Sequence, residues 1–431
     1  MDWSGDGVRK ASVWARLLGV ERTVIEQIEF DDEEELLICH VRPVKAERRR
    51  CGICRRRCGG YDAGSGRRRW RALDLGTVRA VLEADAPRVR CPDHGVVVAA
   101  VPWARHAAGH TRFFDDQVAW LAVACSKTAV CQLMRIAWRS VGAIVARVCA
   151  DVDAVSDRFA GLRRIGIDEI SCKKGHKYLT IVVDHDSGLL VWAAEGHDAK
   201  TLGTFFTLLG EQRCQLITHV SADAADWVAR AVEAHCPQAV RCADPFHVIK
   251  WATDALDQAR RDAWNRARAQ AGKGWQDNRG RHTATGHARA LKHARWALWK
   301  NPENLTSHQQ AKLEWIARTD PALYRAYLLK EGLRHVFKVK GDEGKQALDR
   351  WCSWAQRCRI PSFVELSRAI RRHRPAIDAA LDHGLSNALI ESTNTKIRVI
   401  TRVAFGFKDP AALIALAMLS LGGYRPPLPG R

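Results

Sequence analysis

The chain has 431 residues, 47% of them hydrophobic, and its 68 Lys and Arg against 48 Asp and Glu give a formal net charge of +20. This length predicts two to four structural units, and the apolar content excludes a chain that is disordered throughout. The positive charge is concentrated in residues 48–71, with ten arginines and one acid, and in residues 260–300, with eleven Lys or Arg and two acids. Two such blocks predict contacts with nucleic acid.

Membrane insertion and export are not expected from the sequence. The first residues, Met-Asp-Trp-Ser-Gly-Asp-Gly, lack a basic region followed by an apolar run. The longest apolar stretch, residues 411–423, is shorter than the roughly 20 residues that span a bilayer. We therefore expect the 14 cysteines to be reduced thiols of a cytoplasmic protein, with a few reserved for metal.

The first 105 residues predict two small β-rich segments. Residues 1–45 include a loosely alternating stretch, residues 23–41, that is typical of a strand pair. Residues 46–105 are rich in Arg and Gly and contain Cys51-x-x-Cys54 and Cys91-x-x-His94. Paired knuckles of this spacing predict a tetrahedral Zn²⁺ site, with Cys58 as an alternative ligand. The alternative is a set of ordinary thiols without metal.

Residues 106–155 have helical periodicity and contain a candidate helix-turn-helix over residues 127–149. A recognition helix that begins at Arg139 would direct Arg139, Ser140 and also Arg147 towards DNA. The usual turn glycine is missing, and a pair of helices packed only as core is the alternative.

Residues 156–255 predict the succession βββαβαβα, which is typical of a ribonuclease-H-like nuclease core. Strands are expected over residues 164–168, 177–184, 189–194, 216–221 and 239–243, with an Asp-Ser-Gly turn between the second and third. Residues 256–380 are basic, helical and rich in Trp, and we interpret them as an all-α insertion. Residues 381–431 supply the last helix of the core, over residues 387–402, and a tail. The fold class is therefore multidomain α/β.

Three carboxylates at the ends of these elements predict a catalytic site. Asp168 ends the first strand, Asp223 follows the fourth strand, which lies beside the first in such a sheet, and Glu391 lies on the last helix. Converging carboxylates hold the two divalent ions, Mg²⁺ or Mn²⁺, that phosphodiester cleavage requires. A single Asp at a strand end is more often a helix cap or turn residue. Asp244 is the reserve candidate for the second position.

The last helix also predicts a polar face and an apolar face. The polar face contains Glu391 together with candidate DNA-binding residues, and the apolar face would dock on the sheet. The candidate DNA-binding residues are Asn394, Lys396, Arg398 and Arg402, and the apolar residues are Ile390, Ile397 and Ile400.

Several segments together resemble the ISL-three-type insertion-sequence transposases. They occur in the right order and cover most of the chain: Gly166-Ile-Asp-Glu169, Lys174-Gly-His-Lys-Tyr178, Ser221-Ala-Asp223, Asp244-Pro-Phe-His-Val248, Asn301-Pro-Glu-Asn-Leu-Thr306, Lys330-Glu331, Glu391-Ser-Thr-Asn-Thr-Lys-Ile-Arg398 and Gly406-Phe407. The resemblance implies that Asp168, Asp223 and Glu391 form the acidic triad of the DDE superfamily. It also implies an amino-terminal zinc-binding and helix-turn-helix DNA reader. The sequence departs from the family at His94, where a second cysteine is more usual.

The resemblance implies DNA transposition as the function. The partners would be double-stranded DNA, namely the terminal inverted repeats of the element and its target, with a homo-oligomer assembling on DNA at the bacterial nucleoid. The alternative is a domesticated nuclease, or a zinc and helix-turn-helix regulator that does not transpose. A regulator would not need all three carboxylates, and all three are present.

Overall fold

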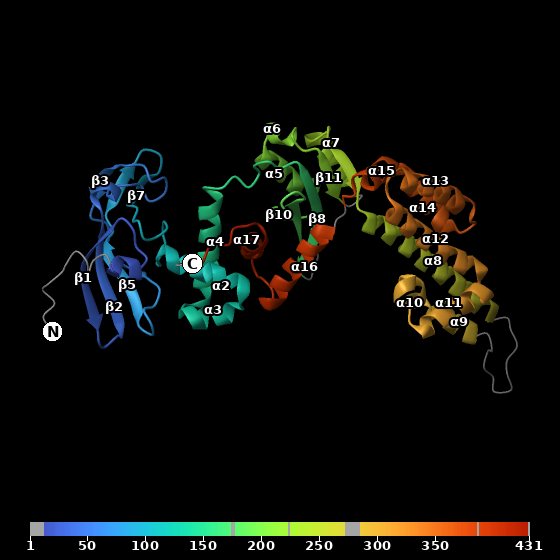
Figure 1. Ribbon diagram of the computed structural model, residues 1–431, viewed down its shortest axis with the longest axis horizontal. Coiled ribbons are helices and arrows are strands. Elements are labelled where there is room, and N and C mark those ends of the chain that lie inside the picture. Colours follow the sequence, from blue (N-terminus) through green and yellow to red (C-terminus); the bar gives the residue numbers. More distant parts are fainter. Residues whose placement is uncertain (1–12, 174–176, 223–224, 272–284, 386–387, 430–431) are drawn as a thin grey trace. The chain divides into compact units, whose positions relative to one another are not determined.

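The computed structural model describes residues 13–173, 177–222, 225–271, 285–385 and 388–429 (Figure 1). The chain forms two compact units: the first contains Met1–Arg158 and Ile397–Arg431, and the second contains Phe159–Lys396. We expected residues 381–431 to supply the last helix of the nuclease core and a tail. The division between the units falls inside this segment: residues up to Lys396 belong to the second unit, and Ile397–Arg431 belong to the first, where the helix near the end of the chain packs on the amino-terminal helices.

The first unit contains a four-stranded sheet that begins with the predicted strand pair. Its order is β1-β2-β5-β4, with β1 and β2 antiparallel and β2 and β5 parallel. The predicted boundary between residues 45 and 46 therefore divides strands that share one sheet, because the strand of residues 79–85 returns to pair with the first hairpin. The strands are β1 (Thr23–Asp31), β2 (Leu36–Pro43), β4 (Arg67–Arg71) and β5 (Arg79–Asp85).

A smaller sheet of order β3-β6-β7 lies next in the first unit, formed by Gly59–Asp62, Arg88–Cys91 and Gly95–Val98. A short 3-10 helix, η1 (Lys45–Glu47), precedes it. The β6–β7 hairpin has Gly95 at φ +66°, a left-handed conformation that glycine adopts without steric cost. Cys91 ends β6, and His94 lies in the turn between β6 and β7.

Four helices complete the first unit: α2 (Arg112–Ala124), α3 (Lys127–Met134), α4 (Trp138–Asp153) and α17 (Pro410–Leu421). The Thr111 and Ser126 hydroxyls cap α2 and α3 by accepting from backbone amides, as expected for these residue types. Helix α17 packs on α4, and the Cys149 thiol donates to the Ala415 carbonyl over 3.2 Å. No single helix among the described residues is both long and apolar enough to cross a membrane; α3 and α4 meet that test only as a pair, with a 98° bend between them.

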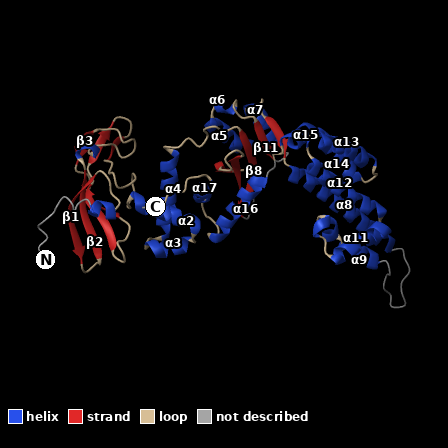
Figure 2. Ribbon diagram, viewed as in Figure 1, coloured by secondary structure: helices blue, strands red, loops and turns tan. Residues whose placement is uncertain are grey.

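The second unit is built on a five-stranded sheet of order β10-β9-β8-β11-β12 (Figure 2). The first three strands are antiparallel, and β11 pairs in parallel with both β8 and β12. The strands are β8 (Arg164–Lys173), β9 (Lys177–Asp184), β10 (Leu190–Glu195), β11 (His219–Ala222) and β12 (Val240–Ala243). The predicted succession of strands and helices is present, with one additional short helix.

Helices α5 (Ala199–Leu209) and α7 (Asp226–His235) pack on one face of this sheet, and α6 (Glu211–Cys214) lies between them in the chain. Ile165, Ile167 and Val220 point into the same buried core as Phe205 and Val232. Because side chains alternate along a strand, the residues between these apolar positions lie on the opposite face.

The predicted insertion is entirely helical over its described residues. Its helices are α8 (Pro245–Ala271), α9 (Thr285–Lys292), α10 (Arg295–Trp299), η2 (Pro302–Asn304), α11 (Ser307–Thr319), α12 (Pro321–Val339), α13 (Gly341–Arg357), α14 (Pro361–Arg372) and α15 (Arg374–His383). Trp351 is buried and donates to the Leu329 carbonyl over 2.7 Å. Lys330 is also buried, and its ammonium donates to the carbonyls at the end of α10. The lysine of the Lys330-Glu331 motif therefore has a structural role.

Candidate functional site

Asp168 lies on the central strand β8, on the sheet face opposite α5 and α7. Ile165 and Ile167 point into the core beneath those helices, so alternation directs Gly166 and Asp168 to the other face. The Asp168 Oδ1 atom accepts a hydrogen bond from the Glu169 amide over 2.8 Å. This face of β8 is therefore the place where the predicted carboxylate is presented.

Helix α16 (Ala388–Val403) packs against this face of β8 at Gly166. A Cβ atom at Gly166 would lie 2.4 Å from Cδ1 and 2.8 Å from Cγ1 of Ile390, closer than real carbon atoms approach. Ile390 is completely buried. The missing side chain of Gly166 is thus what allows the helix to approach the strand, and it confirms the predicted docking of Ile390 on the sheet.

This approach joins α16 to Asp168 directly. The Asn394 Nδ2 atom donates to Asp168 Oδ2 over 2.7 Å, and Asn394 is only 4% exposed. Glu391 lies one turn earlier than Asn394 on the same helix and is exposed. Residues three apart share a helix face, so Glu391 lies on the same side of α16 as Asn394.

Of the two other candidate carboxylates, the structure describes only Asp244. Asp223 lies outside the described residues. Asp244 is 2% exposed and accepts from the Phe246 and His247 amides and from His247 Nδ1, the last over 2.7 Å. Through these contacts Asp244 caps the start of α8, which is the common role of an Asp at the end of a strand.

A histidine that the sequence did not single out lies beneath the site. His185 Nε2 is 2.7 Å from the Ser221 hydroxyl, and Ser221 is opposite Gly166 in the pairing of β11 with β8. Burial lowers the pKa of His185, so its ring is neutral near pH 7. The pair ties the turn after β9 to β11 next to the glycine on which α16 rests.

The remaining polar candidates on α16 have two different environments. Lys396, Arg398 and Arg402 are exposed, as expected of phosphate contacts. Asn394, by contrast, is buried, and its amide donates to Asp168. Its predicted contact with DNA stays a prediction. Ile400 lines an apolar pocket of the first unit and does not dock on the sheet.

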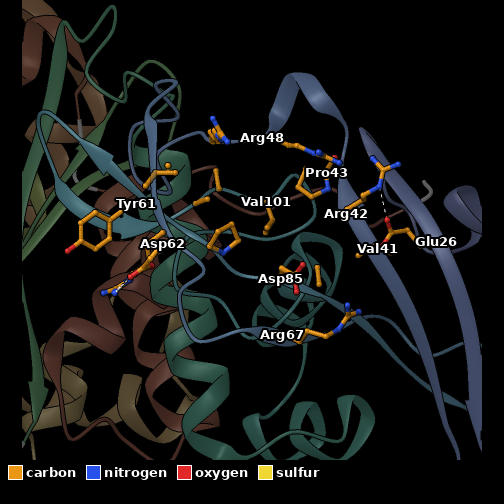
Figure 3. Close-up of a pocket in the computed structure, with 18 residues that line it drawn as sticks. Glu26, Val41, Arg42, Pro43, Arg48, Tyr61, Asp62, Arg67, Asp85 and Val101 are labelled. Atoms are coloured by element: carbon orange, nitrogen blue, oxygen red, sulfur yellow. Dashed lines mark hydrogen bonds and ion pairs between the residues drawn. The ribbon is translucent and has the colours of Figure 1, made fainter.

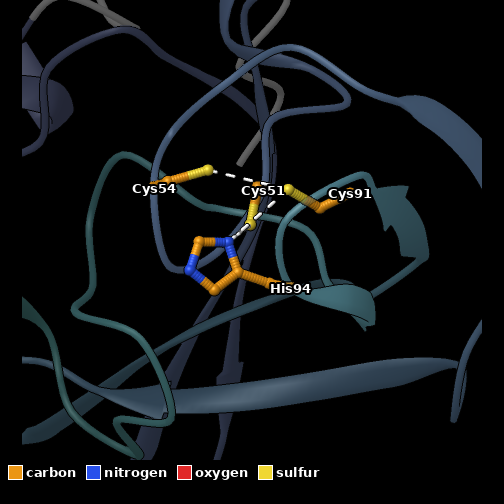
Figure 4. Close-up of side chains that lie close together, drawn as sticks. All are labelled: Cys51, Cys54, Cys91 and His94. Atoms are coloured by element: carbon orange, nitrogen blue, oxygen red, sulfur yellow. Dashed lines mark hydrogen bonds between the residues drawn. The ribbon is translucent and has the colours of Figure 1, made fainter.

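Cys51, Cys54, Cys91 and His94 converge at one point of the first unit (Figure 4). Their ligand atoms all lie within 4.8 Å of one another. The separations are 3.7 Å for Cys54 Sγ to Cys91 Sγ, 3.5 Å for Cys91 Sγ to His94 Nδ1 and 3.8 Å for Cys51 Sγ to His94 Nδ1. Tetrahedral zinc requires about 3.8 Å between two sulfurs and about 3.5 Å between sulfur and nitrogen. The four residues fit that ion.

The chemistry of the cluster agrees with its geometry. Burial raises the pKa of the Cys91 thiol, but hydrogen bonds with His94 and with the backbone lower this pKa by a larger amount, to about 6. The thiolate is the form that binds metal. Cys58 is not a member of the cluster, and its sulfur lies 3.3 Å from the Arg56 carbonyl. The cluster therefore consists of three cysteines and His94, and Cys58 lies beside it, hydrogen-bonded to Cys91.

Helices α3 and α4 meet at 98°, within the range of a helix-turn-helix. Arg135 occupies the left-handed turn position, at φ +52°, where a glycine is usual. Arg139 is exposed and Ser140 is half-buried at the start of α4. Arg147 does not face DNA: it donates over 3.0 Å to Asp115, which is completely buried, so that expectation is corrected.

A cavity of about 660 Å³ in the first unit is lined by residues of both sheets (Figure 3). Its arginines are partly neutralised. Arg42 donates to Glu26 over 2.7 Å, and Arg88 donates to Asp62 over 2.9 Å. Arg67 reaches Glu83 beside the cavity over 2.8 Å. Within the basic block of residues 48–71, Arg67 and Arg69 both pair with Glu83, an acid from outside the block.

Comparison with known proteins gives matches to each part of the chain. Residues 165–417 match the transposase family ISL3, residues 99–149 match the helix-turn-helix domain of that family, and residues 47–94 match the zinc-finger of transposases IS204, IS1001, IS1096 and IS1165.

Full-length relatives agree. Transposases for insertion sequence element IS1557, from Mycobacterium tuberculosis strains CDC 1551 and H37Rv, are 66% identical over 98% of both chains. The transposase for insertion sequence element IS1001 from Bordetella parapertussis is 27% identical over 89% of this chain and 92% of its own.

The domains and relatives define a DNA-processing enzyme of the insertion-sequence transposase class. Within that class, the chain belongs to the transposase family ISL3. The resemblance drawn from the sequence motifs is thereby confirmed.

Proposed function

We propose that this protein binds the terminal inverted repeats of its element and catalyses Mg²⁺-dependent strand cleavage and strand transfer, with Asp168, Asp223 and Glu391 as the metal-holding carboxylates. The observation that carries the proposal is the Asn394–Asp168 hydrogen bond of 2.7 Å, because it joins the helix of Glu391 to the strand of Asp168. Two elements more than 200 residues apart in the chain thus supply one polar site.

The sheet supports a ribonuclease-H-like core. Its order β10-β9-β8-β11-β12 has the first strand at the centre, antiparallel to the second and parallel to the fourth. Asp168 lies on that central strand, and Asp223 comes directly after Ala222, the last residue of β11, in the sequence. Ala222 pairs with Ile167, the neighbour of Asp168.

The donor set fits a hard divalent ion. Asp168 and Glu391 offer carboxylate oxygens, which Mg²⁺ prefers. Bound Mg²⁺ would polarise the scissile phosphate and stabilise the leaving oxygen. The residues of the chain orient the carboxylates, and the exposed Lys396, Arg398 and Arg402 would hold the DNA backbone.

The first unit would supply recognition. Arg139 and Ser140 at the start of α4 are the candidates for base contacts in the major groove, with Zn²⁺ at the Cys/His cluster stabilising the module beside them. A homo-oligomer on DNA would bring two element ends together.

The test is a cleavage and joining assay on a duplex that ends in the element's own terminal repeat. With Mg²⁺, the purified chain should cut that end and join it to a second DNA, and it should leave a duplex with a scrambled end uncut. Sequence-specific binding without cutting would support the alternative, a regulator that does not transpose.

A further inference from the structure

Asn394 is the most unusual polar residue of the candidate site. It is 4% exposed, and among the described residues its Oδ1 atom is buried without a hydrogen-bond partner. Leaving a buried acceptor unpaired costs about 1–3 kcal/mol. An orphaned acceptor beside a carboxylate therefore indicates a ligand that the described residues do not supply.

The orientation of the amide follows from its neighbour. The ionised Asp168 carboxylate can only accept hydrogen bonds, so the NH₂ group must face it, at 2.7 Å. A reversed amide would bring two acceptor oxygens together. The orphaned atom is consequently the oxygen, an atom that takes a cation or a proton donor such as metal-bound water.

Two buried residues that precede Asn394 on α16 restrict the position of its side chain. Ile390, one turn before Asn394, is clamped on Gly166, and Thr393 is buried and donates to the Leu389 carbonyl over 3.0 Å. Asn394 therefore has little freedom to swing away and satisfy its oxygen elsewhere.

We propose that Asn394 is a positioning residue of the divalent-metal site: its NH₂ group fixes the Asp168 carboxylate, and its Oδ1 atom accepts from the water shell of the ion. This inference rests on the proposed function, and it reassigns a residue that the sequence placed among the DNA contacts. Outer partners of metal ligands typically contribute about 10- to 100-fold in metal affinity.

The experiment measures Mn²⁺ affinity of the full-length chain from the electron paramagnetic resonance signal of the free ion. Asn394→Leu keeps the size of the side chain and removes both polar atoms, so it should weaken Mn²⁺ binding about tenfold or more. Thr401→Val, which removes the same kind of hydroxyl-to-carbonyl hydrogen bond later on α16, should bind like the wild type. Asp168→Asn tests the metal site itself and should weaken binding.

A second readout separates positioning from simple packing. Without added Mg²⁺ or Mn²⁺, Asn394→Leu should melt at or above the wild-type temperature, because the substitution removes an unpaired buried oxygen. A residue important only for packing would show the reverse: lower melting temperature and unchanged affinity. If Asn394→Leu does not fold, Asn394→Ser should show the same loss of affinity.

Two results would overturn the inference in different ways. Wild-type Mn²⁺ affinity in Asn394→Leu, with binding weakened in Asp168→Asn, would remove Asn394 from the metal site and leave the proposed function standing. Wild-type affinity in both variants would remove the metal site from this face of the sheet, and the proposed function with it.

Discussion

Gly166 lies two residues before Asp168 on β8, on the strand face that receives α16. Any larger side chain at this position would meet Ile390 and also His185, whose Nε2 atom would lie 2.9 Å from an added Cβ. The carboxylate on the strand and the Asn and Glu on the helix depend on this contact. The residues proposed for the chemistry are thus positioned by a glycine that has no chemical role of its own.

We predict that Gly166→Ala destabilises the protein by about 1–3 kcal/mol, the usual cost of overpacking a core, and greatly reduces strand cleavage. Gly203→Ala is the matched control, because an added Cβ on α5 meets nothing within 4 Å. Chemical denaturation and the cleavage assay check both variants. Wild-type stability and cleavage in Gly166→Ala would show that α16 does not need this close approach.

The contrast between Asp168 and Asn394 shows what the sequence can predict at this scale. The strand pattern predicted that Asp168 ends its strand, but β8 continues to Lys173, so Asp168 lies within the strand. The role of Asn394 depends on a partner 226 residues away. The environment of Arg147 also depends on a distant partner, Asp115, to which it donates. The local sequence does not distinguish such a paired arginine from an exposed one.

At the scale of elements, periodicity predicted the strands of the second unit, the helix-turn-helix and the all-α insertion. It did not predict that β2 pairs with β5 across the assumed domain boundary, because strand pairing between distant segments has no local signal. The four metal ligands could be placed because knuckle spacing is itself a local pattern. The choice between His94 and Cys58 required three-dimensional geometry.

The cluster predicts one zinc ion per chain. Cys51→Ser and Cys91→Ser should each release it, whereas Cys58→Ser should retain it, because Cys58 lies outside the cluster. Loss of zinc should unfold the small β3-β6-β7 sheet and weaken DNA end-binding. Elemental analysis of protein purified without chelator checks the metal, and zinc retained by Cys91→Ser would contradict the assignment.

Helix α4 predicts a separate effect on sequence readout. Arg139→Ala should cost about 1–3 kcal/mol on the cognate end and relax discrimination against a scrambled end. Arg147→Ala should instead lower thermal stability, because it deprives the buried Asp115 of its bidentate partner. Binding titrations on both ends at two salt concentrations distinguish these outcomes. An equal loss on both sequences would make Arg139 a phosphate contact.

At the scale of the whole molecule, the order of domains in the sequence differs from the composition of the units. The first unit takes its last helix from the end of the chain: α17 packs on α4, and the Arg425 guanidinium lies 4.0 Å from the centre of the Trp120 ring. A fragment of residues 1–155 lacks these contacts. The unit that contains the helix-turn-helix therefore also includes residues from the end of the chain.

The central claim is that Asp168, Asp223 and Glu391 hold the metal for DNA cleavage. The most direct measurement is strand cleavage of a terminal-repeat duplex in Mg²⁺ by Asp168→Asn, Asp223→Asn and Glu391→Gln, with end-binding measured in parallel. Each substitution keeps the shape and removes a charge, so several kcal/mol of transition-state stabilisation, about 10³-fold or more in rate, should be lost. End-binding should be unchanged. Cleavage near the wild-type rate by any one variant would contradict the role of that residue, and cleavage by all three would contradict the account.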